Sequence, residues 1–154
     1  MKPTQFLALA TLLTLAYATL STPAAAVTNL TAHDKRAILA EPFKTLKTTT
    51  EIPTTVRAEM VKLNNNYDFD MAEPGQPFQA TDVVTQKLPA RRLIFAAASN
   101  NYCVVHYEQG GIAHFNTVVV FRLGNHKAVL ADRFPVKYTV TDMAALKQTR
   151  KAID

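Results

Sequence analysis

Four short runs of β-branched and aromatic residues in the second half of the chain limit most strongly how it can fold. The runs span residues 92–98, 102–108, 114–123 and 127–134, and turn residues separate them at 99–101, 110–111 and 124–125. Closely spaced strands joined by such turns form an antiparallel meander. We therefore predict a meander of about four strands, with a two-residue type II′ turn at Gly124-Asn125.

The part of the chain before the strands contains helix-start signals. Thr31 with Asp34 three residues later is typical of a helix N-cap, and Pro42 and Pro53 each suit the first turn of a helix. We predict three short helices over residues 31–40, 42–47 and 53–63, although one longer helix with loops fits the same residues. A further helix is expected from about Asp142. Helices followed by a meander predict an α+β fold, with the helices on one side of a curved sheet.

Residues 64–90 have turn chemistry and no apolar period, so we expect a long irregular loop there. Aromatic side chains at Tyr67, Phe69 and Phe78 suggest that this loop is held against the body of the domain. The order of elements is similar to that of cystatin-like and NTF2-like folds. The segment Gln109-Gly110-Gly111 lacks the pattern that protease-inhibiting cystatins carry in their first hairpin loop, so the similarity implies no function.

The first 26 residues have the pattern of a secretory signal peptide. Lys2 is followed by an apolar run from Phe6 to Leu20 and by small residues that end at Ala26. Threonines interrupt the run, which makes it a poor membrane span, and no cysteine near the cleavage region offers a lipid attachment point. We therefore expect cleavage near Ala26, a periplasmic or secreted location, no membrane span after signal removal, and a single domain over residues 27–154.

Charge and cysteine content narrow the function. Removing residues 1–26 leaves 128 of the 154 residues, with 16 basic and 12 acidic side chains. This surplus is modest and dispersed, so we expect no nucleic-acid partner. Cys103 is the one cysteine, which rules out an internal disulfide. A buried thiol inside a strand is its most common role, and an intermolecular disulfide or a catalytic nucleophile are the alternatives.

The register of the hairpin over residues 106–116 decides which side chains meet. A three-residue loop at 110–112 pairs Glu108 with His114 and His106 with Asn116, and it separates the strand residues into two coherent faces. One face is predicted to be apolar: Cys103, Val105, Tyr107, Phe115, Thr117, Val119, Phe121 and Leu123. The other is apolar in its middle and polar toward the hairpin tip: Tyr102, Val104, His106, Glu108, His114, Asn116, Val118, Val120 and Arg122.

In this register His106, Glu108 and His114 converge. Two imidazoles and a carboxylate are the ligand types of a catalytic zinc site, and Glu108 beside His114 also suits acid–base work. An exposed polar end of a hairpin is the alternative explanation. No H-E-x-x-H spacing, nucleophile elbow or phosphate-binding loop supports an enzyme.

Tyr102, Asn116 and Arg122 lie on the same face and are candidates for contact with a bound molecule. Arg122 is expected to face Lys127 across the turn at residues 124–125, where the two charges separate into water or hold an anion. Our leading hypothesis is an exported, non-enzymatic domain without a cofactor that binds a protein or a small ligand. A small metal-dependent or acid–base hydrolase centred on residues 106–116 is the alternative.

Overall fold

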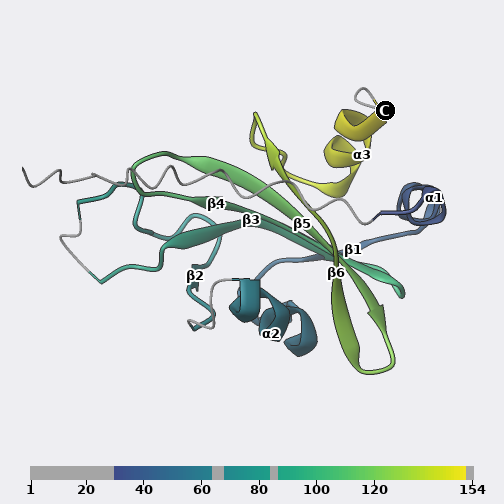
Figure 1. Cartoon of the computed structure of the whole chain (residues 1–154). Coiled ribbons are helices and arrows are strands. Elements are labelled where there is room, and N and C mark those ends of the chain that lie inside the picture. The colour runs from purple at the N-terminus through teal and green to yellow at the C-terminus, as the bar shows by residue number, and fades with distance from the viewer. Residues whose placement is uncertain (1–29, 64–67, 84–86, 152–154) are drawn as a thin grey trace, which may run out of the picture.

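The computed structural model describes residues 30–63, 68–83 and 87–151, and it shows one sheet with helices on both faces (Figure 1). Helices α1 (Ala32–Ala40) and α3 (Met143–Lys151) pack on one face, and α2 (Thr54–Leu63) packs on the other. This confirms the predicted α+β class. The expectation that helices cover only one side is wrong, because both faces of the central strands are apolar and each needs a cover. The predicted signal peptide lies outside the described residues.

The strands form a sheet with a meander at its centre. The described part of the chain contains β1 (Lys44–Leu46), β2 (Met71–Ala72), β3 (Arg91–Ala98), β4 (Tyr102–Gln109), β5 (Phe115–Gly124) and β6 (Lys127–Val136). Five strands follow the antiparallel order β1-β3-β4-β5-β6, and the short β2 lies parallel beside β3. Strands β3 to β6 are the meander that the sequence predicts.

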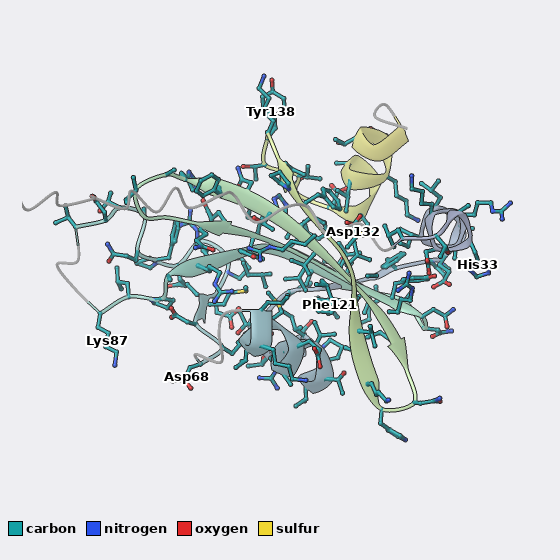
Figure 2. The ribbon with its side chains drawn as sticks, viewed as in Figure 1. His33, Asp68, Lys87, Phe121, Asp132 and Tyr138 are labelled. Carbon is teal, nitrogen blue, oxygen red and sulfur yellow. The ribbon has the colours of Figure 1, made fainter. Side chains whose placement is uncertain are left out.

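Alternate residues of β4 and β5 enter two different cores. Cys103, Val105, Val119 and Phe121 pack with Val56 and Met60 of α2. Tyr102, Val104, Val118 and Val120 pack under α1 and α3, with Leu146 of α3. Figure 2 shows Phe121 on the α2 side of the sheet and Asp132 on the opposite side. The predicted division of side chains between the two faces is therefore correct.

The predicted helix over residues 42–47 is wrong. Residues Lys44–Leu46 form β1, which pairs with Ala98–Ala96 at the edge of β3. Phe43 packs against the core under α1 and α3, whereas Leu46 enters the core under α2. An extended chain sends these two side chains to opposite faces, and pairing with β3 satisfies its backbone groups. Strand β2 likewise interrupts the predicted irregular loop of residues 64–90.

The hairpin between β4 and β5 has a five-residue loop at 110–114 instead of the predicted three-residue loop. Glu108 pairs with Asn116, and His106 pairs with Val118. The shift is two residues, so every side chain keeps its predicted face. The wider loop lies against residues 79–81: a Cβ atom on Gly110 would clash with the Gln79 carbonyl oxygen, and Gly111 forms a β-bridge with Thr81. This contact with a distant segment cannot be read from the hairpin alone.

The turn between β5 and β6 also differs from the prediction by one residue. Its central residues are Asn125 and His126, with φ angles of 44° and 61°, which is a type I′ turn rather than type II′ at Gly124-Asn125. Asparagine adopts left-handed backbone readily, and a type I′ turn matches the twist of the strands. As a result, Arg122 pairs with Val129 and not with Lys127.

The helix ends follow local sequence. Thr31 caps α1 in a capping box with Asp34, as predicted, and α2 begins directly after Pro53. Asp142 accepts a hydrogen bond from the Ala145 amide, at 2.8 Å, and so caps the first turn of α3. Among the described helices, none combines the length and apolar character that crossing a membrane requires.

Candidate functional site: an apolar cleft between two helices

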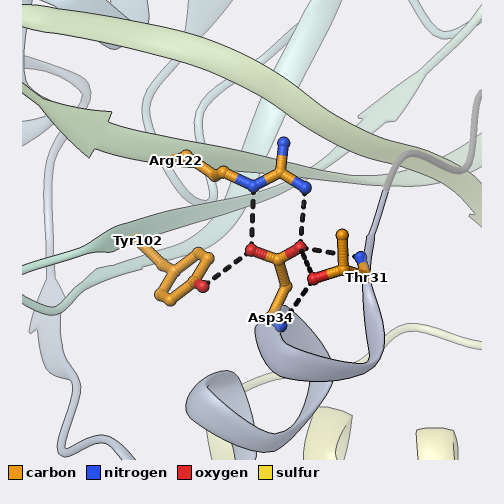
Figure 3. Close-up of polar contacts among 4 residues, drawn as sticks. All are labelled: Thr31, Asp34, Tyr102 and Arg122. Atoms are coloured by element: carbon orange, nitrogen blue, oxygen red, sulfur yellow. Dashed lines mark hydrogen bonds and ion pairs between the residues drawn. The ribbon is translucent and has the colours of Figure 1, made fainter.

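A partly buried ion pair holds α1 against the sheet (Figure 3). The guanidinium of Arg122 donates from Nε and Nη2 to the two carboxylate oxygens of Asp34, at 2.8 and 2.7 Å. The hydroxyl of Tyr102 donates to Asp34 Oδ1 at 2.8 Å, and the Thr31 amide donates to Oδ2 at 2.7 Å. One carboxylate in the first turn of α1 therefore joins the helix cap to β4 and β5.

These contacts change the pKa values of the groups involved. The hydrogen bonds from Arg122 lower the pKa of Asp34 far below its usual range, against the opposing effect of burial, and Thr31 and Tyr102 add to the lowering. Burial, together with the Asp34 carboxylate, raises the pKa of Tyr102 to about 12. Asp34 therefore stays ionised and Tyr102 stays protonated at neutral pH, so the network keeps its donors and acceptors.

A second buried polar contact holds the segment that leads into α3. The Nδ1 atom of His106 lies 2.7 Å from the carbonyl oxygen of Val140, so Nδ1–H donates and the ring takes that tautomer. His106 is completely buried, and its ring meets that of Phe95 edge-on. Its Nε2 atom has no hydrogen-bond partner among the described residues. Burial lowers the pKa of His106 and keeps the ring neutral.

Lys147 ties α3 to the end of α1. Its ammonium donates to the carbonyl oxygens of Leu39 and Glu41, at 3.1 and 3.0 Å, and lies 5.3 Å from the ring centre of Phe43. Carbonyls at a helix C-terminus carry partial negative charge and have no partner within the helix. The lysine therefore fixes the distance between the two helices at this point.

Between these two anchored helices an apolar cleft opens onto the sheet; we call it the α1–α3 cleft. Its apolar walls are Leu30, Ile38, Leu39, Val104, Val120, Phe134, Met143 and Leu146, and Lys35 and Lys147 complete the lining. It holds about 60 Å³ of space for the centre of a water-sized sphere. One water needs roughly 10–15 Å³ by this measure, so the cleft is narrow but larger than a packing defect.

The predicted site residues at the hairpin end are only partly brought together. Glu108 accepts from Nε of Arg92 at 2.7 Å and lies 2.8 Å from Nε2 of His114. Phe78 lies under the guanidinium of Arg92, at 4.6 Å. His106 is turned away toward Val140, although it shares their face. No three His, Cys, Asp or Glu side chains of the described residues are grouped closely enough to hold a metal ion.

Of the three predicted binding residues, two meet in the structure. The side chain at which they meet is Asp34, which the sequence predicted only as part of the α1 helix cap. Tyr102 and Arg122 both contact Asp34, while Asn116 lies apart opposite Glu108. The missed signal was Arg122 itself: an arginine that follows Val118 and Val120 on the apolar part of a strand face needs a counter-charge. Lys35 and Lys147, which line the cleft, carried no local signal.

Cys103 is a buried thiol in the core under α2. Burial raises its pKa to about 12, which keeps it protonated and unreactive as a nucleophile.

Searches with protein-family models, among curated proteins and among solved structures found no match to this chain.

Proposed function

We propose that this chain is a non-enzymatic binding domain that takes the apolar part of a small lipophilic molecule into the α1–α3 cleft. The observation that carries the proposal is the cleft itself, whose eight apolar walls come from two helices and the sheet. Ligand sites are concave and mostly apolar, with a few charged or polar groups that set orientation. The cleft has this composition.

The width of the cleft indicates the shape of its ligand. A cavity volume of about 60 Å³ suits an unbranched chain or a thin planar group. Each methylene moved from water into such a space contributes about 0.8 kcal/mol, so a four-carbon segment contributes roughly 3 kcal/mol. That is enough for a weak complex, and contacts outside the cleft would strengthen it.

The lining favours binding over catalysis. Among the described residues, ten line the cleft: eight apolar side chains and two lysines, so the lining itself supplies no hydroxyl, thiol, imidazole or carboxylate for a nucleophile and base pair. The signal peptide predicted from the sequence supports action outside the cytoplasm. A small hydrolase at residues 106–116 is less well supported, because His106 is buried and bound to Val140 while Glu108 pairs with Arg92 and His114.

The test is titration of the purified protein with 1-octanol, an uncharged molecule with an unbranched tail. We expect saturable binding at one site, followed by calorimetry and by amide shifts in ¹H–¹⁵N spectra. The shifted amides should lie on α1, α3 and the centres of β4 and β5, and not on α2. Non-saturable binding, or shifts centred on α2, would contradict the proposal.

A matched pair of variants locates the site. Leu39 and Val129 are both apolar and partly exposed, at 39% and 52%, but only Leu39 lines the α1–α3 cleft. Leu39→Gln should weaken octanol binding by roughly fivefold, since it removes about 1 kcal/mol of apolar contact. Val129→Gln, on the outer strand β6, should leave the affinity unchanged. Equal losses in both variants would show that octanol does not occupy the cleft.

A further inference from the structure

We infer that the natural ligand of the α1–α3 cleft is an anionic amphiphile, with a carboxylate or phosphate-type head group held beside Lys35 and Lys147. This inference rests on the proposed function, because it concerns the head group of a molecule whose tail enters the cleft. Among the described residues that line the cleft, the two lysines are the charged ones, and both are half-buried. Their alkyl stems extend the apolar walls, and their ammonium groups favour the water-facing side.

The charge of the two helices points to the same ligand class. Helix α1 carries Lys35 and Arg36, and its one acidic residue, Asp34, is buried and neutralised by Arg122. Helix α3 contains no acidic residue. Both helices therefore present positive charge without a competing carboxylate of their own at the surface, which favours an anion over a cation at the opening.

The geometry of Lys147 adds a positioned charge. Two of its donors are used by the carbonyl oxygens of Leu39 and Glu41, which hold the ammonium at the end of α1. An ammonium has three donors, so this arrangement fixes the charge without using all of its hydrogen-bonding capacity. The side chain loses little freedom when an anion binds, because it is already ordered.

On this face of the sheet, several carboxylates of the described residues are engaged or enclosed. Asp142 caps the first turn of α3, and Asp132 is enclosed within the protein. Burial alone raises the pKa of Glu41, yet hydrogen bonds, including one from Asn101, and the charge of Lys147 hold it below its usual value. Among the described residues, Glu41 is an acid that interacts with the charge of Lys147 and would compete with a ligand, and Glu41→Gln is expected to strengthen anion binding.

The decisive experiment compares three molecules with the same tail: octanoate, 1-octanol and octyltrimethylammonium. At low salt we expect octanoate to bind about fivefold more tightly than octanol, the effect of one partly screened charge contact, and the cation to bind most weakly. Equal affinities for octanoate and octanol would overturn the inference of an anionic head group, but they would not contradict the proposed function. Absence of binding by all three would overturn the proposed function itself.

Lysine variants identify the charges responsible. Lys35→Met and Lys147→Met should reduce the ratio of octanoate to octanol affinity toward one, whereas Lys147→Arg should preserve it. Because Lys147→Met also loses two hydrogen bonds, circular dichroism must show that it is folded, and Lys35→Met gives an independent reading. Lys62→Met on α2 is the matched control. If Lys62→Met lowers the ratio as much as the other two, the effect is one of net charge, and the inference is wrong.

Vesicles separate the two sources of such a head group. Neutral phosphatidylcholine vesicles, with and without phosphatidylglycerol, test whether the anion is a membrane lipid. Octanoate binding without vesicle binding indicates a free amphiphile, and binding of both, with competition between them, indicates a lipid head group. Vesicle binding without any octanoate binding would overturn the inference, because the α1–α3 cleft would then not be the anion site.

Discussion

The two faces of the sheet are both buried, but they differ in what they bury. Under α2 the core consists of apolar side chains such as Ile52, Val56 and Phe121, and among the described residues Arg91 is the one buried charged group there. It lies over the ring of Tyr107, near the end of the sheet. Under α1 and α3, two carboxylates and an imidazole are buried, those of Asp34, Asp132 and His106, together with the hydroxyl-bearing ring of Tyr102.

This difference shows two ways to attach a helix. Apolar packing is non-directional, so α2 settles where its side chains fill the space above the sheet. Hydrogen bonds are directional, and they fix α1 through Asp34 and the start of α3 through His106 and Val140. Helices held at such points need not close the gap between them, and the α1–α3 cleft lies in that gap.

The strongest test of this contrast is Asp34→Asn. The change keeps the shape of the side chain but removes the negative charge that Asp34 presents to Arg122, and it weakens the bonds to Tyr102 and Thr31. Removing one partner of a buried pair costs about 3–5 kcal/mol, and the partial exposure of Arg122 places the expected loss nearer about 2–4 kcal/mol. Urea unfolding followed by circular dichroism measures it.

The matched control for Asp34→Asn is Glu59→Gln on α2, which breaks an exposed pair with Lys62 and should cost about 0.5 kcal/mol or less. Octanol binding should also separate the variants, since Asp34→Asn loosens a wall of the cleft and Glu59→Gln does not. Similar stability for both variants would mean that Asp34 does not hold α1.

A smaller effect on the free energy of unfolding is expected from protonation of His106 at acidic pH. Burial lowers its folded-state pKa below the usual 6.5, so as the pH decreases below about 6.5 the unfolded chain takes up a proton before the folded chain does. Stability should therefore be unaffected by this group above pH 6.5 and fall as the pH decreases, by at most about 1.4 kcal/mol per pH unit. The negative charge of Glu108 acts in the opposite direction, because it raises the pKa of His106.

The comparison uses His106→Leu, with unfolding free energies measured across pH 5–8. The variant should be less stable at pH 8, because the Val140 carbonyl loses its donor, but its stability should fall less between pH 6.5 and 5. His33→Gln, on the exposed side of α1, should retain the wild-type pH dependence. An unchanged acid response in His106→Leu would remove the proposed role of this residue.

The success of sequence reasoning depended on how local the determining contacts were. The cap of α1 by Thr31 and Asp34 was predictable, because capping is decided within four residues. The division of β4 and β5 into two faces was predictable from alternation. The loop length at 110–114 was not, because it depends on the contact of Gly110 with residues 79–81, and β1 depends on pairing with β3.

The candidate site was less predictable for the same reason. His106 and Glu108 share a face with His114, as expected, yet the buried bond from His106 to Val140 joins residues 34 positions apart. Arg122 and Tyr102 were singled out correctly, but their common partner, Asp34, lies 88 residues before Arg122. A cleft between two helices becomes visible only when those helices are placed on the sheet.

The smallest effect is expected at the far end of the hairpin, where Glu108 pairs with Arg92 and His114. Arg92 and His114 are substantially exposed, so Glu108→Gln should cost about 1 kcal/mol or less in thermal or urea unfolding. Octanol and octanoate affinities should stay unchanged, since the pair is not part of the cleft. A large loss of ligand affinity in this variant would instead place the binding site at the hairpin end, and the contrast between the two sheet faces would no longer explain function.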